Sequence, residues 1–136
     1  MNWRTRGAAL AAVAGFLGLA LGIRLLVSDG GILDGSGALA QNSGTALYAS
    51  MIYAGVFVLV PTVRPAVAGA AAICFCWTIE LLQLTGVPAT LSSHSLLARL
   101  ALGVTFDPED LLWYVVGVLP LAALHARKSV AGARRA

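Results

Sequence analysis

Charged residues are scarce in this sequence of 136 residues. Asp, Glu, Lys and Arg make up only 11% of the chain, whereas 59% of the residues are hydrophobic. A soluble globular protein carries roughly 25% charged residues, so this composition is typical of a membrane protein. A chain of this length can supply three to five membrane-spanning helices and no soluble domain of any size.

Several kinds of functional site are also missing from the sequence. The nine basic residues lie at the ends of apolar runs and form no single surface, so we expect no nucleic-acid partner. Cys74 and Cys76 share one apolar run, and no second Cys/His cluster completes a zinc site; both are interpreted as packing residues. With no phosphate loop and no Ser/His/Asp order, we predict no metal, no cofactor and no obvious catalytic set.

Four apolar runs dominate what is present. They predict an all-α fold, an integral membrane four-helix bundle that forms a single domain over residues 1–136. The predicted spans cover about residues 8–27, 45–60, 66–86 and 110–126. The small-x-small site at residues 38–40 lies too far from the first run for signal cleavage, so that run is predicted to stay as an anchor.

The segments between and after these runs are predicted from their composition. Residues 28–42 are rich in glycine and serine and indicate a flexible loop. Residues 89–109 are predicted to hold one short amphipathic helix on the membrane surface, because the apolar residues from Leu96 onward share a face. The tail after Ala126 is predicted to be disordered.

Small residues recur along one side of the first run. Ala14, Gly18 and Gly22 are four residues apart, and Gly18-x-x-x-Gly22 is a close-packing motif of membrane helices. The motif has two interpretations: a homodimer through Gly18 and Gly22, or packing against other helices of the same chain. We favour the second, because a small bundle needs such a face in any case.

The basic residues indicate an orientation. Four spans place both chain ends on one side, together with seven basic residues and no acid: Arg4, Arg6, Arg64, Arg127, Lys128, Arg134 and Arg135. The opposite loops hold Arg99 against five acids: Asp29, Asp34, Asp107, Glu109 and Asp110. The positive-inside rule then predicts a multi-pass protein of the cell membrane with both termini in the cytoplasm.

The third run contains the most informative polar residues. Glu80 and Gln83 are three residues apart and share a helix face. An ionisable group at the centre of a membrane helix costs about 2.5–3.5 kcal/mol, so Glu80 is expected to face polar partners. The predicted orientation brings other polar side chains to a similar depth. The candidate ligand-binding or polar-core residues are Glu80, Gln83, Arg24, Asp110, Tyr114, Arg99 and His94. Arg24 either extends to the interface or turns inward to a carboxylate.

The order of these motifs resembles that of a known family. Three motifs carry the resemblance, in this order: Glu80-Leu-Leu-Gln83-Leu84, Leu102-Gly103-Val-Thr-Phe106, and Asp110-Leu111 with Tyr114 and Gly117. With these motifs, the sequence resembles a family of small bacterial membrane proteins of unknown function. That family is itself similar to the VanZ-like proteins linked to glycopeptide resistance. Two positions depart from that pattern: Thr45 follows Gly44 where the family often has an acid, and the arginine expected near Ser93 or His94 is found only at Arg99. The resemblance implies an extracytoplasmic-facing pocket for an anionic lipid or envelope precursor.

Three functions are compatible with these residues. In the first, the protein binds a lipid: arginine holds an anionic headgroup, and Glu80, Gln83, Tyr114 and Asp110 orient it. In the second, an enzyme acts on a lipid-linked substrate with Glu80 as general acid or base. In the third, Glu80, Gln83 and Arg24 form a structural clamp between helices. Transport is not favoured, because the cytoplasmic half of the spans carries no polar path.

Overall fold

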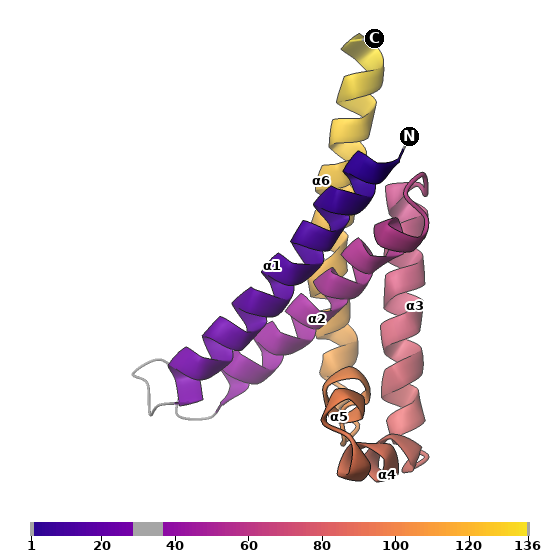
Figure 1. Cartoon of the computed structure of the whole chain (residues 1–136). Coiled ribbons are helices and arrows are strands. Elements are labelled where there is room, and N and C mark those ends of the chain that lie inside the picture. Colours follow the sequence, from indigo (N-terminus) through magenta and orange to yellow (C-terminus); the bar gives the residue numbers. More distant parts are fainter. Residues whose placement is uncertain (1, 29–36, 136) are drawn as a thin grey trace.

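The computed structural model of the chain describes residues 2–28 and 37–135. Over these residues it contains helices and no strands, so the predicted all-α fold is confirmed for the part described. The helices are α1 (Trp3–Ser28), α2 (Ala38–Leu59), α3 (Pro65–Gln83), α4 (Val87–His94), α5 (Leu96–Leu102) and α6 (Asp110–Arg135) (Figure 1). By length and composition, α1, α3 and α6 could each span a membrane.

Helix α2, which the sequence predicted as the second span, is not in that group. Its 22 residues are sufficient in number, but its first two turns carry polar side chains at Gln41, Asn42, Ser43 and Thr45. Residues 38–42 of these turns lie within the segment predicted as a loop. The helix begins at Ala38, seven residues before the predicted start at Thr45. Residues 29–36, the rest of that predicted loop, lie outside the described residues.

The core lies among α2, α3 and α6, which all contact one another. Its buried side chains include Tyr53 and Phe57 from α2, Ala72 and Cys76 from α3, and Val118 from α6. Helix α1 contacts α2 and no other helix of the described chain, and it runs along the outer side of α2 (Figure 1). The four-helix bundle is therefore not confirmed in detail, because the structure has a three-helix core with α1 laid against one member.

Glycine allows two of the core helices to approach closely, but not at the predicted motif. A Cβ atom on Gly117 of α6 would overlap the main-chain carbonyl of Ala46 in α2, and Ser50 Oγ donates to Gly117 O across the same contact at 2.8 Å. At Gly18 and Gly22, by contrast, a Cβ would meet nothing within 4 Å. The prediction that these two glycines pack against other helices of the chain is therefore wrong.

The segment between α3 and α6 forms two short helices where one was predicted. Helix α3 ends at Gln83, and Gly86 (φ +75°) turns the chain into α4. Ser95 is extended, and its Oγ accepts a hydrogen bond from Ala98 N at 3.3 Å, which caps α5 and separates it from α4. The predicted disordered tail is also wrong within the described residues, because α6 continues beyond Ala126 to Arg135.

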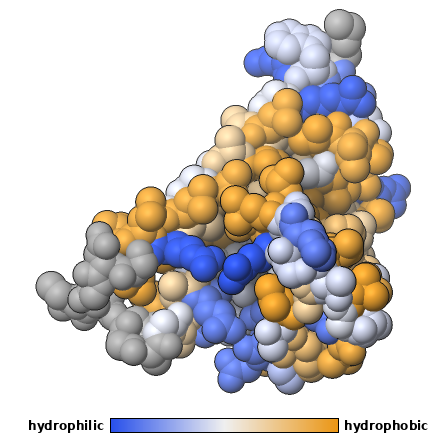
Figure 2. Space-filling view, turned by 60° about the horizontal axis from the view of Figure 1, so that its bottom comes forward, coloured by the Kyte–Doolittle hydropathy of each residue, from blue (hydrophilic) through white to orange (hydrophobic). Residues whose placement is uncertain are grey.

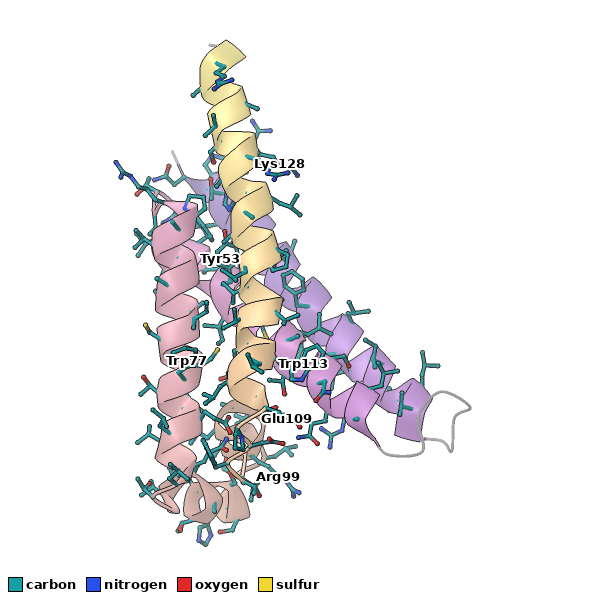
Figure 3. All side chains as sticks on the ribbon, turned by 180° about the vertical axis from the view of Figure 1, so that it is seen from behind. Tyr53, Trp77, Arg99, Glu109, Trp113 and Lys128 are labelled. Atoms are coloured by element: carbon teal, nitrogen blue, oxygen red, sulfur yellow. The ribbon has the colours of Figure 1, made fainter. Side chains whose placement is uncertain are left out.

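The two ends of the molecule differ in charge. Helix α1 begins and α6 ends at the same end of the structure (Figure 1). Lys128 lies toward that end, whereas Arg99 and Glu109 lie at the opposite end, beside α4 and α5 (Figure 3). The acidic start of α6 is therefore remote from the basic chain termini.

Candidate functional site: a polar pocket beside a buried glutamate

Glu80 in the last turn of α3 is the buried centre of the polar region. Its side chain is 0% exposed, and Tyr114, on α6, is 6% exposed. Tyr114 OH donates to Glu80 Oε2 at 2.8 Å, and Asp107 N donates to Glu80 Oε1 at 2.7 Å. The carboxyl group therefore connects α3 to α6 and to the segment that precedes α6.

Asp107 adopts a local structure that presents its main-chain amide to Glu80. Its own Oδ1 accepts from Glu109 N at 3.0 Å, across the turn at Pro108 and Glu109 that leads into α6. Its Oδ2 accepts from Gln41 Nε2 of α2 at 2.8 Å. One residue thus joins the start of α6 to both α3 and α2.

Asp110 and Gln83 extend the polar network on either side. Thr45 Oγ1 of α2 donates to Asp110 Oδ1 at 2.9 Å. Gln83 Nε2 donates to Leu102 O at 2.7 Å, whereas Gln83 Oε1 is buried without a hydrogen-bond partner. Gly103 has φ +67°, a conformation that favours glycine, and a Cβ there would displace the Gln83 amide.

A pocket of about 390 Å³ lies between the α1–α2 pair and the ends of α3, α5 and α6. Its polar wall comprises Arg24, Gln41, Thr45, Tyr48, Gln83, Thr105, Asp110 and Tyr114. Its apolar wall includes Phe16, Leu17, Ala20, Leu21, Leu47, Met51, Ile79 and Leu100. Figure 2 shows hydrophilic surface in the hollow between these parts, bordered by hydrophobic surface.

The polarity of the pocket wall formed by α1 changes along the helix. Residues 16, 17, 20, 21 and 24 all line it, and this three-to-four-residue spacing is that of one helix face. The first four positions are apolar and the last is Arg24. The wall is therefore apolar toward the middle of α1 and cationic near its end.

The structure brings some of the predicted site residues together and separates others. Gln83, Arg24, Asp110 and Tyr114 share the pocket wall. Glu80 lies behind Tyr114 and is not part of the wall, and the hydrogen bonds to its two oxygens come from Tyr114 and Asp107, not from the expected arginine.

Arg99 and His94 stand apart from that group. Both are exposed, on α5 and α4, and neither is among the described residues that line the pocket. Arg99 lies near the α4–α5 end of the molecule (Figure 3).

Sequence reasoning missed Gln41, Thr45 and Asp107 as parts of the site. Gln41 and Thr45 are four residues apart, which places them on one face if the segment is helical. That signal was present, but the segment around Gln41 was assigned to a loop. Asp107 was recognised only as a helix cap, and its amide hydrogen bond to Glu80 depends on tertiary structure.

Residues 35–118 match the family described as "protein of unknown function (DUF2809)". The match covers more than half of the chain, so the protein belongs to that family, and the expected membership of a family of unknown function is confirmed. Neither the curated proteins nor the solved structures contain a significant match. Within the described residues, no group of three or more His, Cys, Asp or Glu side chains could hold a metal ion.

Proposed function

We propose that this member of the DUF2809 family is an integral membrane protein that binds one lipid-like amphiphile in the pocket. The observation that carries the proposal is the graded wall of α1, apolar from Phe16 to Leu21 and cationic at Arg24. An acyl chain fits the apolar part. An anionic group of the headgroup, phosphate or carboxylate, fits the guanidinium, which forms charge-assisted and often bidentate hydrogen bonds with such groups.

The size of the pocket supports a ligand of this class. Its volume of about 390 Å³ falls within the range of roughly 300–1,000 Å³ typical of small-molecule sites. Apolar lining with a few fixed polar groups is also typical of such sites. Two of these polar groups are held in place from behind, since Thr45 is bonded to Asp110 and Tyr114 to Glu80.

We further propose that α2 is the fourth span. Its 22 residues measure about 33 Å as a helix, enough for a hydrocarbon core of about 30 Å. Gln41 and Thr45, which make α2 less apolar than the others, line the pocket. Polar side chains of membrane helices commonly face a cavity of this kind.

Four spans, together with the positive-inside rule, place both termini in the cytoplasm of the cell and the pocket near the extracytoplasmic side of the cell membrane. The resemblance to VanZ-like proteins supports the same placement. The anionic lipid or envelope precursor that it implies agrees with the present proposal in one requirement, an anionic group in the headgroup.

Glu80 has a different role in this proposal, that of a structural clamp. Its two oxygens accept hydrogen bonds from two other segments, and it is fully buried. A general acid or base must come within hydrogen-bond reach of its substrate, and Glu80 is not on the pocket wall. We therefore assign it to stability and not to chemistry on a lipid-linked substrate.

Native mass spectrometry of the protein purified in mild detergent tests lipid binding. The wild-type protein should retain one lipid per chain. Arg24→Gln should lose it, because the headgroup loses its cationic partner. The matched control is Arg6→Gln, which removes an exposed arginine from the opposite end of the same helix. A spectrum without lipid for the wild type, or equal retention by Arg24→Gln, would contradict the proposal.

The same spectra report the oligomeric state. We propose that Gly18 and Gly22 are the contact of a homodimer, because both face open space on α1 and leave room for the backbone of a second copy. A monomer at every protein concentration in the micromolar range would exclude this dimer.

A further inference from the structure

The part of the pocket near Asp110 and Gln83 has an excess of hydrogen-bond acceptors. Among the described lining residues, Arg24 is the only basic side chain and Asp110 the only acidic one. Two further carboxyl groups lie one residue behind the wall, Glu80 bonded to Tyr114 and Asp107 bonded to Gln41. Three acids are thus set against a single guanidinium.

The side-chain oxygen Oε1 of Gln83 is a further acceptor, and no donor is bonded to it. Its Nε2 is held by Leu102 O, so the amide is oriented with Oε1 away from that bond. Oε1 is buried and has no partner, although Gln83 lies on the pocket wall. Buried polar atoms are nearly always hydrogen-bonded, so the unpaired Oε1, covered within a residue of the wall, indicates a place where a donor is missing.

Asp110 offers a second acceptor on the wall of the same pocket. Thr45 donates to Oδ1, and within residues 37–135 no donor reaches Oδ2 at hydrogen-bond distance. Two hydroxyl donors of this wall are already engaged: Tyr48 OH donates to Ala101 O and Tyr114 OH to Glu80. A ligand with hydrogen-bond donors and a positive charge is therefore favoured at this end.

From these contacts we infer that the headgroup is zwitterionic, with a phosphate at Arg24 and a primary ammonium group beside Asp110 and Gln83. The inference rests on the proposed lipid binding and narrows its ligand to an aminophospholipid. An ammonium group carries three N–H donors and a positive charge, which matches two acceptors and the excess of acids. A headgroup with phosphate alone would leave both acceptors without a charged partner.

Three lipids with identical acyl chains separate these requirements. Phosphatidylethanolamine has the phosphate and the N–H donors. Phosphatidylcholine has the same charges but no N–H donor. Phosphatidylglycerol has the phosphate and hydroxyl donors but no positive charge. Each is titrated into the delipidated protein in detergent, and the apparent Kd is read from the bound fraction in native mass spectra.

We expect phosphatidylethanolamine to bind the wild-type protein at least about tenfold more tightly than either of the other lipids, since hydrogen bonds to a charged group add at least one such factor. Asp110→Asn should reduce that preference to less than about threefold, because phosphatidylethanolamine loses both the charge and the hydrogen bond, whereas phosphatidylcholine loses only the attraction between charges. Glu109→Gln is the matched control, because Glu109 is the neighbouring acid and is not on the wall; it should keep the preference.

The outcomes test two claims separately: that the protein binds a lipid, and that the headgroup of this lipid carries an ammonium group. Equal binding of phosphatidylethanolamine and phosphatidylcholine, or tightest binding of phosphatidylglycerol, overturns the inference and leaves lipid binding at Arg24 intact. No binding of any of the three lipids overturns both. The comparison among lipids uses only the wild-type protein, so it decides the question even if Asp110→Asn fails to fold.

Discussion

Removal of the Tyr114 hydroxyl is the most direct test of how the polar region is held together. Tyr114→Phe leaves the aromatic ring in place and deletes the donor to Glu80 Oε2, a hydrogen bond of 2.8 Å between residues that are 6% and 0% exposed. Glu80 Oε2 then loses the only side-chain hydrogen bond that the described residues give it.

Two magnitudes bound the expected loss. Leaving a buried polar group unsatisfied costs about 1–3 kcal/mol in soluble proteins. Side-chain hydrogen bonds in membrane proteins contribute less, about 0.6 kcal/mol on average and up to about 1.7, because the unfolded chain in the membrane also finds partners. Glu80 is among the largest fully buried side chains of the protein. We therefore expect Tyr114→Phe to lower the free energy of unfolding by about 1–1.7 kcal/mol, in the upper part of the membrane range.

The assay is reversible unfolding by SDS in mixed micelles, followed by far-UV circular dichroism. Tyr48→Phe is the matched control: it deletes a hydroxyl that also makes a 2.8 Å bond, but to the exposed carbonyl of Ala101, so the loss should be about 0.5 kcal/mol. A double-mutant cycle with Glu80→Gln should give a coupling of about 0.6–1.7 kcal/mol. Zero coupling, or a smaller loss for Tyr114→Phe than for Tyr48→Phe, would refute the clamp.

Two further predictions test helix packing and burial. Gly117→Ala should lower the free energy of unfolding by about 1–3 kcal/mol or prevent folding, because its Cβ would overlap a main-chain carbonyl that cannot rotate away. Gly55 has open space around it, so Gly55→Ala should leave the stability unchanged or raise it. Thermal unfolding measures both variants. N-ethylmaleimide should modify the exposed Cys74 in detergent, while the buried Cys76 should react only after unfolding. Mass spectrometry measures the modification of each cysteine. Equal rates of modification at the two cysteines would show that α3 does not pack as described.

Local pattern was sufficient for much of the fold. Long apolar runs predicted α1, α3 and α6 as membrane helices, and Asp107-Pro108 predicted the start of α6. The sequence pattern gave the wrong prediction at the start of α2 and at the end of α6, because polar residues are helical in both places. Both are helix ends whose composition is typical of loops or tails, and the polar start of α2 is held in place through tertiary hydrogen bonds to Asp107 and Asp110.

Sequence alone determined that Glu80 would be buried and partnered, because the cost of an ionisable group inside an apolar helix depends only on its neighbours along the chain. Which partners it has was decided by the tertiary structure. Tyr114 is 34 residues away and the Asp107 amide 27 residues away, and nothing in their local sequence favours them over Arg24. The same holds for the pocket, since a cavity exists only where helices diverge, and that divergence of α1 and α2 from α3 and α5 follows from the packing of their side chains.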